Sequence, residues 1–385
     1  MSVDIWWQGL PDDPTSEVKV CVRADATGTV GLTVNGSRFT ASADTTVADG
    51  NVAITATGLS SNSEYSFSLD FDGAPAFTST TEKLKTFDTT SSFKVGYGSC
   101  VSVNEAMIYG YHAAENCDAF ILMGDTPYVD VAAGTYWGET VVDISDDQTE
   151  ANFYTFYRAF HRTPGVEHMG HNIPIVRMWD DHELPGDNWD HTIAQANSSG
   201  GAINPNVTLQ SEVDAIFATG QTAFESYSLC NPSNGDNPTN EAPFMADAAA
   251  SAYHAKYFRV TLGNTEYFVT DCITHRGPVG AATRTAETLA DADARMLGDN
   301  QRLWLTTKLA ASTATNKIVV STKKTYVNND DNADTWDEIG SGSTWPGFIT
   351  ERDTLLTIID LTVTGCSFIA GDRHAFSVIN HSSAR

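Results

Sequence analysis

Basic residues are scarce in this chain. Its 385 residues hold 22 Lys and Arg against 49 Asp and Glu, for a net charge of −27. Nucleic-acid backbones and anionic membranes are bound through clustered Lys and Arg, so this composition argues against both partners. A small phosphate ester would be attracted only by local positive charge, such as bound cations. The acidic balance also favours a source in salty surroundings, where self-repulsion is screened.

Long apolar runs are missing as well. No run approaches the ~20 residues that cross a bilayer, and the start, MSVDIWWQGL, lacks the features of a secretory leader. We therefore expect no membrane span, and a protein that is cytoplasmic or whose leader is absent. The 6 cysteines are scattered without a CxxC pair. Most are expected to be small buried apolar residues, with disulfides and the redox compartment left open.

The length predicts about two domains. Residues 18–86 contain short alternating strands separated by Gly, Asn and Ser turns, which predicts a β-sandwich. Leu59 and Tyr65 are spaced as in the tyrosine corner of immunoglobulin-like and fibronectin type III domains. We expect a sandwich domain over 1–88 and a catalytic domain over 89–385. Trp6 and Trp7 are interpreted as core aromatics, with docking between the domains as the alternative.

Beyond residue 92, strands alternate with helical segments. Helices are predicted over 152–161 and 300–311, each with apolar side chains on one face, and the aromatic stripe of the first is interpreted as core. Segments 186–241 and 326–347 are rich in polar and small residues. Loops of that length are usually lids or family insertions.

Six stretches resemble buried strands that run directly into metal-binding or proton-handling side chains. In open α/β sheets, ligands bind beyond the carboxyl ends of the strands, so these side chains are predicted to meet. The stretches are 93–100 (FKVGYGSC), 119–128 (AFILMGDTPY), 173–183 (IPIVRMWDDHE), 267–276 (YFVTDCITHR), 317–324 (KIVVSTKK) and 367–374 (SFIAGDRH).

Two of these strand ends carry the strongest signal. Gly124 permits a tight turn, Asp125 offers two oxygens that can bridge two cations, and Tyr128 offers a phenolate. The four adjacent ionisable side chains of Asp-Asp-His-Glu at 180–183 would repel and desolvate one another unless cations or hydrogen bonds compensated them. Together they predict a metal centre.

The motifs GSC, GDTPYVD, WDDHE, LGDNQRLWL with KIVVS, WPGFITERDTLL and GDRH occur in this order. The set resembles the PhoD-like alkaline phosphatases of the metallophosphatase superfamily, from residue 93 to the end. The resemblance implies an α/β fold, a four-layer α/β/β/α sandwich preceded by a small all-β immunoglobulin/fibronectin-like domain. It implies a centre of two or more metals, Fe³⁺ and Ca²⁺ with Mn²⁺ or Zn²⁺ as alternatives. The implied activity is hydrolysis of phosphomonoesters and phosphodiesters.

By that resemblance the iron is held by Cys100, Asp125, Tyr128 and His374, and Asp125 bridges to the second metal. A thiolate, a phenolate and an imidazole suit a transition metal. Calcium prefers hard oxygens. Its implied ligands are Asp181 and Asp372, with Asn188 as a further ligand or a phosphate contact. A metal-bound water or hydroxide would then attack phosphorus in line.

Several further residues are candidates for handling phosphate or protons. His182 matches the His that protonates the leaving group or binds phosphate. Guanidinium forks match phosphate oxygens, although for each Arg a salt bridge is the alternative. The Arg candidates are Arg276, Arg373 and Arg158, and His275 and Asp271 are potential supporting partners.

Two features depart from the family pattern. Ile273 stands where relatives carry an Arg, and the chain stops soon after GDRHAFSV, so wider substrate access is expected. The leading hypothesis is a secreted-type enzyme, periplasmic or extracellular, that releases phosphate from small organic esters. The alternatives are a dedicated phosphodiesterase or phospholipase-type enzyme with the same metals, and a non-catalytic binding protein stabilised by metal.

Overall fold

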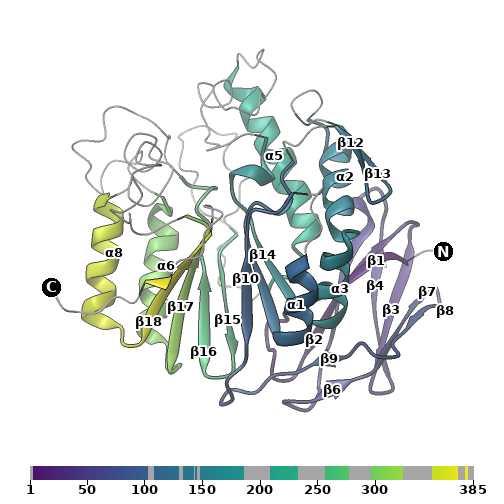
Figure 1. The fold of residues 1–385 in the computed structure, drawn as a ribbon, viewed down its shortest axis with the longest axis horizontal. Coiled ribbons are helices and arrows are strands. Elements are labelled where there is room, and N and C mark those ends of the chain that lie inside the picture. The colour runs from purple at the N-terminus through teal and green to yellow at the C-terminus, as the bar shows by residue number, and fades with distance from the viewer. Residues whose placement is uncertain are drawn as a thin grey trace.

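Two β-sheets packed face to face form the centre of the structure, a computed structural model that describes residues 3–102, 108–129, 133–142, 144, 148–185, 209–232, 256–276, 296–323, 349–371 and 378–379. Helices cover the outer face of each sheet, and an all-β unit lies beside one helical layer (Figure 1). The predicted four-layer α/β/β/α fold with an N-terminal β-sandwich is confirmed.

The first sheet has the order β10-β11-β14-β1-β2-β5. Strands β10, β11 and β14 are parallel, whereas β2 is antiparallel to both β1 and β5. Its strands are β10 (Val95–Gly98), β11 (Ala119–Met123), β14 (Ile175–Met178), β1 (Val3–Gly9), β2 (Val18–Ala24) and β5 (Asn51–Ala56).

The second sheet has the order β15-β16-β17-β18-β19, with β16, β17 and β18 parallel. Each of the six predicted strand stretches contains or overlaps a strand of these two sheets. The strands are β15 (Phe258–Leu262), β16 (Thr265–Val269), β17 (Asn316–Ser321), β18 (Cys366–Ala370) and β19 (Val378–Ile379).

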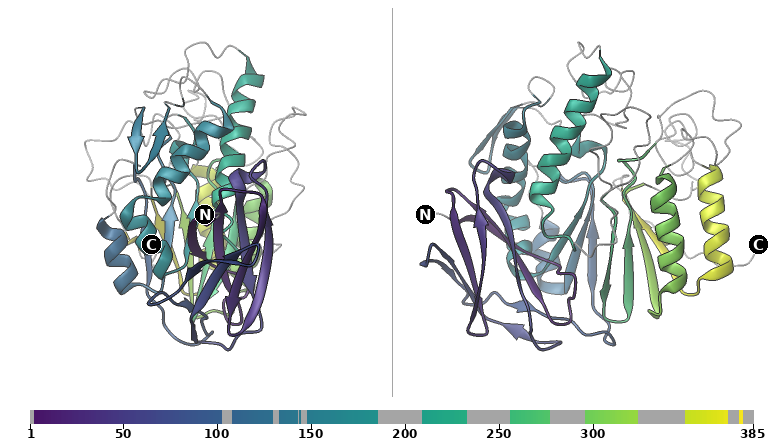
Figure 2. Two further views of the ribbon diagram at one scale, coloured as in Figure 1. Left: turned by 90° about the vertical axis from the view of Figure 1, so that its right-hand side faces the viewer. Right: turned by 180° about the vertical axis from the view of Figure 1, so that it is seen from behind.

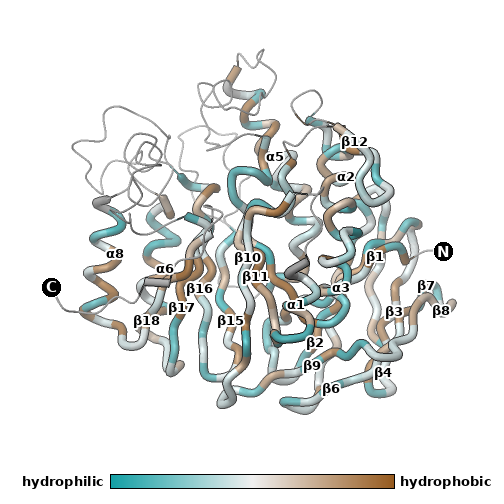
Figure 3. Tube along the Cα trace, in the orientation of Figure 1, coloured by the Kyte–Doolittle hydropathy of each residue, from teal (hydrophilic) through white to brown (hydrophobic). Residues whose placement is uncertain are grey.

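The apolar strands are continuous in sequence because both of their faces are buried. In β11, Ile121 and Met123 lie in the core between the sheets, whereas Phe120 and Leu122 pack against the helices. Successive side chains of a strand point to opposite faces, so one run supplies two cores. Figure 3 shows apolar colour along the central strands.

Helices α1 (Ile108–Asn116), α2 (Glu150–His161), α3 (Pro164–Asn172) and α5 (Gln210–Tyr227) cover the first sheet. Helices α6 (Gly298–Ala311) and α8 (Ile349–Thr362) cover the second (Figures 1 and 2). Among the described helices, none is long and apolar enough to cross a membrane. The aromatic stripe of α2 is core, as predicted: Phe153, Phe156, Tyr157 and Phe160 are each 0% exposed.

The N-terminal unit packs a four-stranded sheet, β4-β3-β7-β8, against β1, β2 and β5. The Tyr65 hydroxyl accepts a hydrogen bond from the Ser60 amide at 2.8 Å, which confirms the tyrosine corner. The remaining elements are β3 (Gly28–Val34), β4 (Ser37–Ala43), η1 (Ala48–Gly50), β6 (Glu64–Tyr65), β7 (Phe67–Phe71), β8 (Ala74–Thr78), β9 (Leu84–Lys85), β12 (Gly134–Tyr136), β13 (Glu139–Val141) and η2 (Asp181–Glu183).

The two adjacent tryptophans join this unit to the helical layer. Trp6 belongs to the N-terminal core and stacks on His171 of α3, with ring centroids 4.0 Å apart. Trp7 belongs to the larger core and stacks on Tyr227 of α5 at 6.1 Å. Both are therefore core residues and docking residues. The division at residues 1–88 and 89–385 stays a prediction.

Candidate metal centre

The turns that follow β10 and β11 carry the first candidate ligands in a left-handed backbone conformation. Cys100 has φ 62° and Asp125 has φ 54°. Such angles are unfavourable for residues other than Gly, and they cluster at functional sites, where the surroundings hold them. Gly124 has φ 81°, and a Cβ there would lie 2.6 Å from the Cβ of Asp180. The turns after β11 and β14 are therefore in direct contact.

Glu183 ties these two turns together. Its carboxylate accepts hydrogen bonds from the backbone amides of Asp125 at 2.9 Å, Thr126 at 2.7 Å and Asp180 at 2.8 Å. The side chain is fully buried, and burial raises the pKa of Glu183 to about 7, although the three amides act to lower it. The residue therefore fixes the backbone on which Asp125, Asp180 and Asp181 are mounted.

Three buried carboxylates converge at this contact. Asp125, Asp180 and Asp181 each offer an oxygen within 4.8 Å of the others, and they are 1%, 0% and 1% exposed. Burial, followed by the charge of Asp181, raises the pKa of Asp125 well above its usual value. For Asp181, burial acts in the same direction, but the charge of Lys323 and other cations outweighs it and lowers the pKa of Asp181. Bound cations would relieve the repulsion at Asp125.

A thiol and a phenol lie beside the carboxylates. The Cys100 Sγ is 3.4 Å from the Asp125 Oδ2. Burial, followed by the charges of Asp125 and Cys100, raises the pKa of Tyr128. Its ring packs against that of His182 at an interplanar angle of 33°, with centroids 4.1 Å apart. This mixture of sulfur and oxygen donors fits a transition metal next to a cation that prefers oxygen.

The second sheet contributes to the same edge through β17 and β18. Lys323 follows β17, and its Nζ lies 2.9 Å from the Asp180 Oδ2 and 3.0 Å from the Asp181 Oδ1. The Gly371 amide donates to the Ser321 carbonyl at 3.1 Å, and a Cβ on Gly371 would lie 2.8 Å from the Met123 carbonyl oxygen. Gly371 immediately precedes Asp372. The predicted ligands Asn188, Asp372 and His374, and also Arg373, lie outside the described residues.

The predicted residues after β16 divide between the site and its support. Arg276 is 1% exposed, and its positive charge acts on Asp181 to lower the pKa of that carboxyl. Asp271 instead stabilises the turn that follows β16, because its carboxylate accepts hydrogen bonds from the amides of Ile273 and Thr274, both at 2.9 Å. Ile273 is 2% exposed within the core under the first helical layer. A supporting role for His275 stays a prediction.

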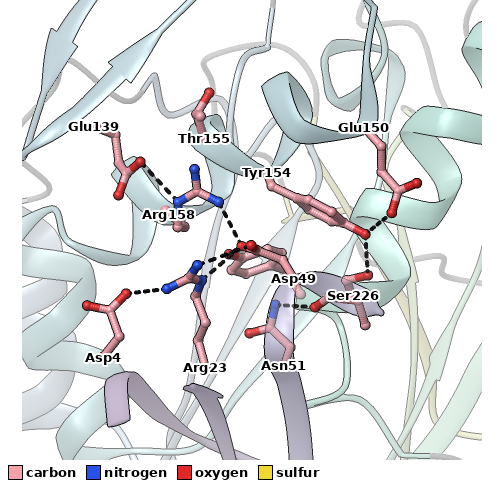
Figure 4. Close-up of polar contacts among 12 residues, drawn as sticks. Asp4, Arg23, Asp49, Asn51, Glu139, Glu150, Tyr154, Thr155, Arg158 and Ser226 are labelled. Atoms are coloured by element: carbon pink, nitrogen blue, oxygen red, sulfur yellow. Dashed lines mark hydrogen bonds and ion pairs between the residues drawn. The ribbon is translucent and has the colours of Figure 1, made fainter. Parts of the chain in front are cut away.

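Arg158 takes part in a separate cluster of charges. Its Nη1 lies 2.9 Å from the Asp49 Oδ2, and its Nε lies 3.0 Å from the Glu139 Oε2 (Figure 4). The salt-bridge alternative is therefore the one that the structure shows for this Arg.

Sequence reasoning assigned no role to Glu183 or Lys323. Glu183 stands in the WDDHE motif, but the pattern does not show that its carboxylate turns back onto backbone amides. Lys323 lies near the end of the predicted strand stretch 317–324, but its partner Asp181 is 142 residues away in the chain. Only the strand-end rule could have drawn attention to it.

Two stacked sheets flanked by helices, with buried carboxylates at the carboxyl ends of their strands, form the architecture of a metallophosphatase. The profile of the PhoD-like phosphatases matches residues 95–384, and the chain belongs to this family, which makes it a phosphatase-type hydrolase. The solved structure of PhoD is similar, with a TM-score of 0.71 at 17% identity over 96% of this chain and 71% of that one. The structure of purple acid phosphatase PPD1 from yellow lupin (Lupinus luteus) seeds gives a TM-score of 0.49 at 11% identity. The match covers 85% of this chain and 52% of that one. Among curated proteins, no sequence matches.

Proposed function

We propose that this chain hydrolyses phosphate esters, acting on phosphomonoesters and phosphodiesters in the manner of an alkaline phosphatase. The observation that carries the proposal is the convergence of Cys100, Asp125 and Asp181 at one edge of the paired sheets. Fe³⁺ would be held by Cys100, Asp125 and Tyr128 together with His374. Ca²⁺ would be held by Asp125 and Asp181 together with Asp372 and Asn188. When bound, these cations supply positive charge to the phosphate oxygens and lower the pKa of a water molecule.

The remaining chemistry falls to side chains of the chain itself. His182 is half-buried, and its ring is held against Tyr128 while its amide donates to the Asp125 Oδ1 at 3.4 Å. This places an imidazole at the edge of the carboxylate cluster, where it would give a proton to the leaving oxygen. Arg276 brings a guanidinium to the same cluster and would bind the phosphoryl oxygens. Both roles are part of the proposal.

The proposal extends to the substrate class and the place of action. A chain this acidic needs local cations to attract a phosphate ester, which suits small substrates that enter the metal centre. We extend the proposal to an enzyme that acts outside the cytoplasm and releases phosphate from organic esters.

Hydrolysis of p-nitrophenyl phosphate and bis-p-nitrophenyl phosphate, measured side by side at alkaline pH, tests the proposal. Turnover should need Ca²⁺ and should stop in a chelator. Asp125→Asn should reduce it by more than about 100-fold, because loss of a ligand exceeds the loss of a group that merely supports one. The control is Asp70→Asn, since Asp70 pairs with Arg38 on the N-terminal sandwich and lies far from the site.

The outcomes separate the candidate functions. Turnover of the diester alone would make the chain a dedicated phosphodiesterase. Full activity of the Asp125→Asn protein, or no turnover of either ester by metal-loaded protein, would reject the proposed function.

A further inference from the structure

Lys323 is a buried cation placed among the buried carboxylates of the metal centre. Its side chain is 0% exposed, and the two aspartates that it contacts are 0% and 1% exposed. Burying an ammonium is costly unless opposite charges surround it. Here it lies 2.9 Å from the Asp180 Oδ2 and 3.0 Å from the Asp181 Oδ1. One ammonium therefore compensates two adjacent carboxylates.

The ammonium is held in place by the structure around it. The Lys323 amide donates to the Ser321 Oγ at 3.1 Å, and the Ser321 hydroxyl donates to the Lys323 carbonyl at 2.8 Å, which fixes the turn after β17. Asp180 is fixed from the other sheet, because its amide donates to Glu183. Lys323 therefore crosses from the second sheet to the first at a defined position.

We propose that the Lys323 ammonium acts as a resident cation that occupies a position between Asp180 and Asp181 which a divalent metal ion would otherwise take. Asp180 is then neutralised within the protein, and metal binding is left to Asp125, Asp181 and the donors beside them. Lys323 thereby determines how many metal ions the centre binds. The inference concerns the same site and rests on the metal centre of the proposed function.

Counting bound calcium tests this assignment without using turnover. Each protein would be freed of calcium with a chelator and titrated with Ca²⁺ in a calorimeter. Lys323→Met should bind one more Ca²⁺ per chain than the unchanged protein, because the carboxylate pair loses its internal cation. The double variant Asp180→Asn with Lys323→Met should bind no extra ion.

Lys317→Met is the matched control. Lys317 lies on β17, the strand that precedes Lys323, and is 6% exposed, but its Nζ donates to backbone carbonyls, those of Ala314 at 2.8 Å and Thr364 at 3.3 Å. Its loss removes a buried ammonium without uncovering a carboxylate pair. The number of bound Ca²⁺ ions should stay as in the unchanged protein, whatever happens to stability.

Asp180→Asn alone decides the question if the Lys323→Met protein does not fold. The number of bound Ca²⁺ ions should not change, whereas Asp181→Asn removes a ligand and should weaken calcium binding by more than about 100-fold. Loss of an ion in Asp180→Asn, or no additional ion in folded Lys323→Met, overturns the proposal. If the unchanged protein hydrolyses neither ester but the ion counts follow this pattern, the proposed function fails and the role of Lys323 stands.

Discussion

Glu183 shows how a single side chain can position a site that it does not enter. Its two carboxylate oxygens accept hydrogen bonds from three backbone amides, which belong to two turns that are far apart in sequence. Backbone amides bonded to a carboxylate are charge-assisted and stronger than neutral pairs. The amides of Asp125 and Thr126 both donate to Glu183, and these two hydrogen bonds hold Asp125 in its left-handed conformation. The geometry of the candidate metal centre therefore depends on a residue behind the proposed ligands.

Glu183→Gln should weaken both the fold and the catalytic activity. A glutamine side chain presents one acceptor and one donor, so its NH₂ group would face an amide donor, and leaving a buried group unsatisfied costs about 1–3 kcal/mol of unfolding free energy. Hydrolysis should fall by about 10–100-fold, the range for groups that support metal ligands. Urea unfolding and p-nitrophenyl phosphate turnover would measure the two effects. The exposed Glu64→Gln is the control, and equal behaviour of the two variants would contradict the role of Glu183.

At the scale of elements, the sequence predicts strands better than it predicts their partners. Short continuous apolar runs such as AFILM are recognisable because both faces of each strand are buried. The strand-end rule then brings Cys100, Asp125 and Asp181 together, as the structure confirms for these described residues. It could not show that β1 joins the first sheet, because β1 pairs with β14 through Gly9 and Ile175, far apart in the chain. The contacts of Lys323 and Asp49 could not be predicted either, because their partners Asp181 and Tyr227 lie 142 and 178 residues away in the chain.

The turn after β11 is an element whose geometry requires glycine for two separate reasons. Gly124→Ala would place an alanine at φ 81° and its Cβ 2.6 Å from the Asp180 Cβ. The left-handed conformation alone costs about 1–2 kcal/mol. Overpacking adds about 1–3 kcal/mol and displaces Asp180. We expect loss of hydrolysis together with a total loss of about 2–5 kcal/mol of unfolding free energy.

Gly36→Ala separates the two contributions. Gly36 lies in the β3–β4 hairpin at φ 78°, and a Cβ there would meet no atom within 4 Å. This variant should lose only the conformational part, about 1–2 kcal/mol, and should keep its activity. If urea unfolding gave the same loss of unfolding free energy for Gly124→Ala and Gly36→Ala, the close approach of Asp180 to Gly124 would add no steric cost.

At the scale of the whole molecule, one carboxylate connects three parts of the chain. Asp49 of η1 accepts hydrogen bonds at 2.9 Å from Arg23 of β2 and from Arg158 of α2 (Figure 4). It also accepts a hydrogen bond at 2.6 Å from the Tyr227 hydroxyl of α5. The same helix α5 packs through Gly220 against Leu184, next to Glu183. The N-terminal unit is therefore joined by charge, as well as by Trp6 and Trp7, to the helices behind the metal centre.

Asp49→Asn should cost more than an ordinary surface ion pair does. It leaves two guanidiniums without their shared carboxylate, and hydrogen bonds to charged groups are worth about 1.5–3 kcal/mol. The control Asp70→Asn breaks the pair with Arg38, whose side chain is 43% exposed, so solvent screening makes the expected loss smaller than in Asp49→Asn. Urea unfolding at pH 7 compares the two variants. A loss in Asp49→Asn no larger than that in Asp70→Asn would contradict the role assigned to Asp49.

The lowered pKa of Asp49 also predicts how the stabilisation lost in Asp49→Asn depends on pH. Burial acts to raise the pKa of Asp49, but hydrogen bonds from Arg23 and Tyr227 and the charge of Arg158 outweigh it and hold that pKa below its usual value. A carboxyl with a lowered pKa in the folded state binds fewer protons there than in the unfolded chain. Its stabilisation is complete above the unfolded pKa of about 4 and is lost as the pH falls through the lower folded value. The difference in unfolding free energy between the unchanged protein and Asp49→Asn should therefore be constant from pH 7 to pH 5 and shrink toward pH 3. A difference that stayed constant down to pH 3 would show that the charge on Asp49 does not stabilise the junction.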